Sequence, residues 1–214
     1  HGASSWVALL PGSRLQEIRK HLPILLETVS SLQGVVAVVA MAPGVDSSVY
    51  QAILNTRVRS HKEGSERVLL THRTRDLLAC SDAALVASGT ATLEAALLDC
   101  PMVAVYKVNP LSYRLGKALV KVPYVSLVNL ILGREAIPER LQGQMTAQVL
   151  RADLIKLLPS ADGQPMPDAQ AQRESYAALR TILAPSRGGP EPSSTLTASS
   201  RAVSCLEQAG LLAE

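Results

Sequence analysis

Short apolar runs alternate with longer amphipathic stretches along the first two thirds of the chain. Residues 6–10, 35–41, 83–87 and 102–106 form such runs without a charged residue, and residues 68–70 form a shorter one. Runs that lack an apolar/polar alternation are typical of strands covered on both faces in a parallel sheet. The pattern therefore predicts a strand in each run.

The stretches between these runs have helical spacing. In residues 15–32, apolar side chains recur every three or four positions, which is the period of one helix face. Strands that alternate with helices indicate an α/β fold built from βαβ units. The same interpretation predicts an extended segment at 124–127 and further helices in the polar segment before residue 57 and at 75–80, 91–98, 111–120 and 146–158.

The α/β pattern ends near residue 158. Residues 1–158 are expected to form one domain. Residues 159–214 are expected to form a tail, with a helix at about 170–183, a mobile linker rich in Pro, Gly and Ser at 185–200, and a short terminal helix. We expect these tail helices to pack on a further domain. The chain opens without Met and enters a strand almost at once, so we also expect it to be a fragment of a longer protein.

The composition excludes several classes of protein. Of the 214 residues, 47% are hydrophobic and 18% charged, which is the composition of a globular domain and not of a disordered chain. Aromatic residues make up 3% and the net charge is +3, which disfavours nucleic acid as a partner. The three Cys and four His residues lack metal-ligand spacing, so no metal and no other cofactor is expected. His21 is interpreted as a surface or packed side chain.

Candidate binding residues follow the first predicted strand. In an open α/β sheet, ligands bind outside the carboxyl ends of the strands, which is where residues 11–14 (PGSR) fall. Gly12 permits a close backbone approach, Ser13 is placed to cap the next helix, and Arg14 can grip a phosphate with two hydrogen bonds. The alternative is a helix cap with a solvated arginine.

A second candidate follows the strand at 83–87, in the segment SGTATLE at 88–94. A glycine turn that opens a helix offers unpaired amides and the positive end of the helix dipole to an anion. Ser88 and Thr90 add hydroxyl groups, and Glu94 can accept hydrogen bonds from a ribose diol. The alternative is an ordinary helix start with a surface carboxylate. The segment is neither a P-loop nor a GxGxxG fingerprint.

Two weaker candidates come later in the chain. Asn129, predicted at a strand end and followed by a Gly-Arg pair at 133–134, is a candidate for contact with a sugar or phosphate. The predicted helix at 111–120 has an apolar stripe and a basic flank, which suits either a membrane surface or packing on the sheet. Its membrane-facing candidates are Arg114, Lys117 and Lys121.

These motifs, taken in order, resemble the C-terminal, donor-nucleotide-binding half of lipid-A-disaccharide synthases. The resemblance rests on ALLPGSRLQEI at 8–18, the segment at 81–135 that contains SGTATLE and YVSLVNLILGRE, and IPERLQ at 137–142. It covers about residues 6–160 and implies a Rossmann-like parallel sheet flanked by helices, as in the C-terminal half of a GT-B-type glycosyltransferase, followed by a helical tail. Val128 departs from the family, which has proline before the asparagine.

The resemblance also implies an activity. Such enzymes are inverting transferases that move 2,3-diacylglucosamine from UDP-2,3-diacylglucosamine to lipid X, and they release UDP and lipid A disaccharide 1-phosphate without a metal. They act in the cytoplasm, peripherally at the inner membrane face, or in an organelle if the source is a photosynthetic eukaryote. The motif match implies substrate-binding roles for Ser13, Arg14, Ser88, Gly89, Thr90, Glu94 and Asn129.

The resemblance implies no catalytic residue in this half. The catalytic base is expected in an N-terminal acceptor domain that would be supplied in cis or in trans, so the 214-residue chain alone is expected to bind UDP weakly and to transfer nothing. Two alternatives remain open at this point. One is a non-catalytic UDP-sugar-binding remnant, and the other is an enzyme like UDP-N-acetylglucosamine 2-epimerase.

Overall fold

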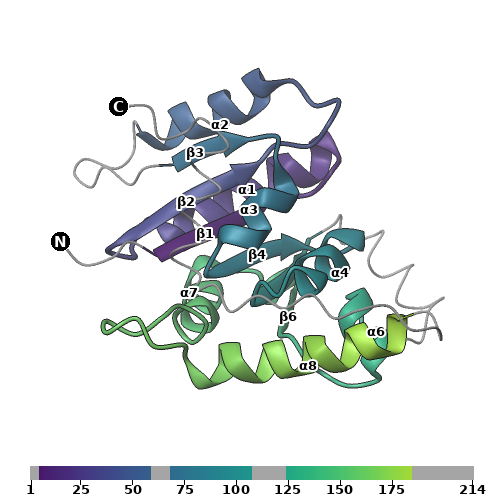
Figure 1. The fold of residues 1–214 in the computed structure, drawn as a ribbon. Coiled ribbons are helices and arrows are strands. Elements are labelled where there is room, and N and C mark those ends of the chain that lie inside the picture. Colours follow the sequence, from purple (N-terminus) through teal and green to yellow (C-terminus); the bar gives the residue numbers. More distant parts are fainter. Residues whose placement is uncertain (1–4, 59–67, 108–123, 185–214) are drawn as a thin grey trace.

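Six parallel strands form a single sheet in the part of the chain that the structure, a computed structural model, describes: residues 5–58, 68–107 and 124–184 (Figure 1). The strand order is β3-β2-β1-β4-β5-β6, and every pairing is parallel. The strands are β1 (Ser5–Leu10), β2 (Val35–Ala40), β3 (Val68–Thr71), β4 (Ala83–Ala87), β5 (Met102–Tyr106) and β6 (Glu139–Leu141).

Helices cover both faces of this sheet, and each face has its own apolar core. One core takes side chains from α1 (Leu15–Val29), α2 (Ser47–Val58) and α7 (Ala147–Ile155). The other takes side chains from α3 (Thr74–Cys80), α4 (Thr90–Leu97), α6 (Leu127–Leu132) and α8 (Pro167–Leu183). The expected fold class, a Rossmann-like sheet with flanking helices and a C-terminal helix, is confirmed.

The uninterrupted apolar runs are explained by this two-sided burial. Along β1, Val7 and Leu9 enter one core, whereas Ala8 and Leu10 enter the other. Successive side chains of a strand point to opposite faces, so a strand covered on both faces needs an apolar residue at every position. No helix among the described residues is long and apolar enough to cross a bilayer.

The structure differs from the predicted elements around residue 126. The segment 124–127 was predicted to be extended, but Ser126 caps α6, which begins at Leu127, and its Oγ accepts a hydrogen bond from the Asn129 amide at 3.3 Å. Asn129 therefore lies in a helix and not at a strand end. The strand β6 was not predicted at all, because it has three half-buried residues, ERL, and no apolar run marks it.

The helix α8 packs on the sheet of this chain. The Gln172 side chain accepts a hydrogen bond from the Met102 amide at 2.7 Å and donates one to the Met102 carbonyl at 3.1 Å, so it joins α8 to the start of β5. Tyr176 and Leu179 are fully buried in the second core, and Figure 1 shows α8 alongside α6. The helix expected at about 170–183 therefore packs on the sheet of this chain through its buried face. The predicted linker at 185–200, the terminal helix and the helix at 111–120 lie outside the described residues.

Candidate functional site: a cleft at the switch point of the sheet

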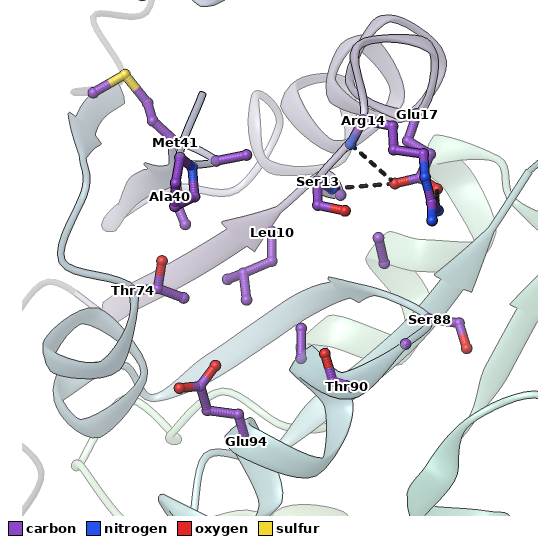
Figure 2. A pocket seen from close by; sticks show the side chains of 16 residues that line it. Leu10, Ser13, Arg14, Glu17, Ala40, Met41, Thr74, Ser88, Thr90 and Glu94 are labelled. Atoms are coloured by element: carbon purple, nitrogen blue, oxygen red, sulfur yellow. Dashed lines mark hydrogen bonds and ion pairs between the residues drawn. The ribbon is translucent and has the colours of Figure 1, made fainter. Parts of the chain in front are cut away.

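A cleft of about 480 Å³ opens at the carboxyl ends of β1, β2 and β4 (Figure 2). From β1 the sheet grows toward β2 and β3 on one side and toward β4, β5 and β6 on the other, so the cleft lies where the strand order reverses. This switch point is the usual ligand site of open α/β sheets, and the volume suits a nucleotide-sized ligand. Six of the predicted residues line it: Ser13, Arg14, Ser88, Gly89, Thr90 and Glu94.

The turn after β1 forms the first wall and is held by Glu17. The Glu17 carboxylate accepts hydrogen bonds from the amides of Ser13, at 3.1 Å, and Arg14, at 3.3 Å. Gly12 lies directly over this side chain: its φ is +117°, and a Cβ there would lie 2.5 Å from Glu17 Oε2. The helix begins at Leu15, so its cap residue is Arg14 and not Ser13 as predicted, and the Glu17 carboxylate rather than a Ser13 hydroxyl pairs with the free backbone amides of this turn.

Arg14 provides the positive charge of this wall. Its Nη1 donates to Glu17 Oε1 at 3.0 Å, while 80% of its side chain remains exposed. A guanidinium has five N–H donors, so a single contact with Glu17 leaves donors for an anion in the cleft. Figure 2 shows Ser13, Arg14 and Glu17 grouped on one side of the cleft.

The N-terminus of α4 forms the opposite wall. Gly89 is the cap residue, with a φ of +150° that favours glycine, and the Thr92 hydroxyl donates to its carbonyl at 2.8 Å. The first amides of a helix have no partner within the helix, so they present donors and a partial positive charge here. The Ser88 hydroxyl donates to the Val125 carbonyl at 3.1 Å, which joins this turn to the segment before α6.

Glu94 lies one turn into α4 and is held by an arginine that the sequence analysis missed. Arg75 Nε donates to Glu94 Oε1 at 2.7 Å, and Thr74 lines the cleft beside it. Figure 2 shows Glu94 and Thr74 on the side of the cleft away from Arg14. Nothing in the sequence marks Arg75 as a partner of Glu94, because the two residues are 19 positions apart on different helices.

The third side of the cleft is the turn after β2, which contributes Met41, Ala42 and Pro43. The Ala42 amide donates to the hydroxyl oxygen of Tyr50 at 2.8 Å, and Tyr50 is fully buried on α2. Burial raises the pKa of Tyr50, so its hydroxyl stays protonated and neutral. This contact holds the turn against the first core and was not predicted.

Asn129 does not line the cleft. It is fully buried, and its Oδ1 accepts hydrogen bonds from the amides of Ala136, at 2.7 Å, and Ile137, at 3.0 Å. Its Nδ2 donates to the Ile137 carbonyl and to Glu139 Oε1, each at 2.9 Å. The side-chain amide is therefore engaged in the interior, where it shapes the chain between α6 and β6.

The Glu139 carboxylate connects this interior site to the cleft. It accepts hydrogen bonds from the amides of Val125, at 2.8 Å, and Ser126, at 2.9 Å, and from the Ser126 hydroxyl. Val125 in turn accepts the hydrogen bond from Ser88 at the edge of the cleft. Asn129 thus lies behind the α4 wall and is joined to it through Glu139 and Val125.

The remaining predicted residues fall elsewhere. Arg114, Lys117 and Lys121 lie outside the described residues. Among the described residues, no group of three or more His, Cys, Asp or Glu side chains is placed to hold a metal ion.

Comparison with known proteins identifies the family. The family model described as lipid-A-disaccharide synthetase matches residues 2–184. The chain belongs to this family. The lipid-A-disaccharide synthase of Myxococcus xanthus is 40% identical over 167 residues, which are 75% of this chain and 42% of that protein. The synthase of Solibacter usitatus is 37% identical over 185 residues, which are 86% and 46% of the two chains. The chain thus spans less than half the length of these curated relatives.

A solved structure is similar to this chain in fold. The spinosyn rhamnosyltransferase SpnG superposes with a TM-score of 0.50 at 14% identity and covers 84% of this chain and 42% of that one. At this identity the likeness concerns the fold alone. Membership of the synthetase family favours the transferase hypothesis over the epimerase alternative.

Proposed function

We propose that this chain forms the UDP-sugar-binding half of a lipid-A-disaccharide synthase. The reaction would transfer 2,3-diacylglucosamine from UDP-2,3-diacylglucosamine to lipid X and release UDP and lipid A disaccharide 1-phosphate. Because both substrates carry acyl chains, we expect the enzyme to work at the cytoplasmic face of the inner membrane. The observation that carries the proposal is the cleft, in which a guanidinium and a helix N-terminus face each other at the switch point of the sheet.

The donor diphosphate would lie between these two walls. Arg14 would hold phosphate oxygens with paired N–H donors, and the amides at Gly89 and Thr90 would bind from the opposite side. Negative charge grows on the UDP diphosphate as the bond to the sugar breaks, and groups already oriented toward it stabilise the transition state more than the ground state. These residues would supply that stabilisation without a metal.

Glu94 would bind the ribose. Its carboxylate lies on the side of the cleft away from Arg14, and Arg75 fixes one of its oxygens. An ionised carboxylate has only acceptor atoms, so the two ribose hydroxyl groups would donate hydrogen bonds to it. We assign the catalytic base and the lipid X site to the part of the longer relatives that this chain does not match.

Titration calorimetry with UDP and 2′-deoxy-UDP tests the proposal. The 214-residue chain is expected to bind UDP more tightly than the deoxy analogue, by about tenfold, because a charge-assisted hydrogen bond to the 2′-hydroxyl is lost. In Glu94→Gln this difference should shrink to about threefold or less, since a neutral amide makes weaker hydrogen bonds.

Glu174→Gln is the matched control, because Glu174 is exposed on α8 and does not line the cleft. This variant should keep the full difference between the two nucleotides. A wild-type chain that bound neither nucleotide would contradict the proposed function. A chain that bound both equally would remove the role of Glu94.

A further inference from the structure

A buried histidine joins two segments at the carboxyl end of the sheet. His21 lies on α1 with no exposed surface. Its Nδ1 is 2.8 Å from the carbonyl oxygen of Pro11, and its Nε2 is 3.1 Å from both the amide nitrogen and the carbonyl oxygen of Lys107. Both ring nitrogens therefore contact the backbone. The UDP site proposed above assigns no role to this side chain.

The partners decide where the proton lies. The Pro11 carbonyl can only accept a hydrogen bond, so the ring must donate from Nδ1. In a neutral ring Nε2 then carries no proton and accepts the hydrogen bond from the Lys107 amide. The Nδ1–H tautomer thus pairs with the Pro11 carbonyl and the Lys107 amide, and the Lys107 carbonyl, also 3.1 Å from Nε2, receives no donor from the ring.

The two segments that His21 joins are ends of strands that are not neighbours. Pro11 follows β1 and Lys107 follows β5, and β4 runs between them in the sheet. The ring therefore spans the end of β4, where the turn at Ser88 and Gly89 begins. The next three residues after Pro11 are Gly12, Ser13 and Arg14, which all line the cleft.

We propose that His21 is a positioning residue for the nucleotide diphosphate, an inference that rests on the proposed function. Its hydrogen bond fixes the orientation of the Pro11 carbonyl and hence of the Pro11–Gly12 peptide. Because Gly12 is the most permissive residue of this turn, the direction in which Ser13 and Arg14 leave it depends on that peptide. The Nε2 contact anchors the same ring to the end of β5 and so keeps Nδ1 in place.

Three substitutions separate the two contacts. The amide nitrogen of His21→Asn lies near the position of Nδ1 and keeps the donor to Pro11, whereas the amide of His21→Gln reaches the position of Nε2 and keeps only the contact with Lys107. His21→Leu removes both. We expect UDP affinity to fall by about tenfold in His21→Leu and His21→Gln, and by less than about threefold in His21→Asn.

The readout is UDP affinity by calorimetry, with the unfolding temperature of each variant measured in parallel. His72→Leu, at an exposed histidine outside the cleft, is the control and should bind UDP as the wild type does. If His21→Leu does not fold, the comparison of the Asn and Gln variants decides. Equal losses of UDP affinity in His21→Asn and His21→Gln would indicate that the side chain has a purely structural role and would overturn the inference. Wild-type affinity in both variants would overturn it as well.

Nitrogen NMR of the imidazole tests the hydrogen-bond assignment independently of UDP. We expect a proton on Nδ1, and a ring that carries its proton on Nε2 alone would overturn the inference. Failure of the wild-type chain to bind UDP would contradict the proposed function and this inference together. Strong UDP binding that is unchanged in His21→Gln and His21→Leu would overturn the role of His21 alone.

Discussion

Replacing Arg14 with alanine is expected to weaken UDP binding by about 10- to 100-fold. Hydrogen bonds to charged groups contribute about 1.5–3 kcal/mol, and Arg14 lines the end of the cleft where we propose that the diphosphate binds. The side chain is 80% exposed, and its removal leaves the bonds of Glu17 to the backbone of the turn in place. The unfolding temperature should therefore change little, and titration calorimetry measures the effect on binding directly.

Arg14→Lys and Arg19→Ala make this prediction specific. Lysine keeps the charge but lacks the planar fork of the guanidinium, so its loss of affinity should be intermediate. Arg19 lies on the same helix, is exposed and does not line the cleft, so Arg19→Ala changes the net charge equally and should leave UDP affinity within about twofold of wild type. Equal losses in Arg14→Ala and Arg19→Ala would point to a general charge effect and contradict a direct contact.

Replacing Asn129 with alanine is expected to lower the free energy of unfolding by roughly 3 kcal/mol. Four hydrogen bonds of the buried side chain are lost, to the backbone of Ala136 and Ile137 and to the Glu139 carboxylate. Buried polar groups left without partners carry a desolvation cost, which makes this one of the larger effects of a single substitution. Urea denaturation followed by circular dichroism measures the change.

Two further variants separate the contributions at Asn129. Asn129→Asp keeps the acceptor for the two amides but places a second carboxylate against Glu139. Its loss in the free energy of unfolding should be large at neutral pH. The loss should shrink as the pH falls, because the introduced carboxylate is then protonated. Asn55→Ala, at an exposed position of α2, should change stability by less than about 0.5 kcal/mol. A stable Asn129→Ala protein that had lost UDP binding would contradict the interior role and support direct contact with the donor.

The sheet could be predicted because its central strands are buried on both faces. The strand β4 (Ala83–Ala87) has no exposed position, so every residue contributes to the apolar signal. The edge strand β6 carries Glu139 and Arg140 on three half-buried residues and gives no such signal. The helix α6 was missed, and Asn129 was assigned to a strand end, because the apolar residues of LVNLIL suit a strand as well as a short helix.

The cleft could be predicted at the residues that end strands, since parallel strands bring their carboxyl ends together. Arg14 and Glu94 could be found in this way, whereas the side chains that hold the cleft in shape could not. Arg75, Tyr50 and His21 act through partners that are distant in sequence or lie on the backbone, and such pairings depend on the packing of helices. Glu17 makes only the glutamate half of a capping box, by accepting from the Arg14 amide, and the arginine at the cap position hides this signal because its side chain has no acceptor.

We propose that UDP binds in the cleft at the switch point of the sheet. Backbone amide NMR of the 214-residue chain during a UDP titration tests it most directly, because the shifts report where the nucleotide lies. We expect the largest shift changes at residues 12–14 and 88–94, with residues of α8 such as Glu174 unaffected. Saturable binding with its largest changes outside these two segments, or no change at either of them, would contradict the account.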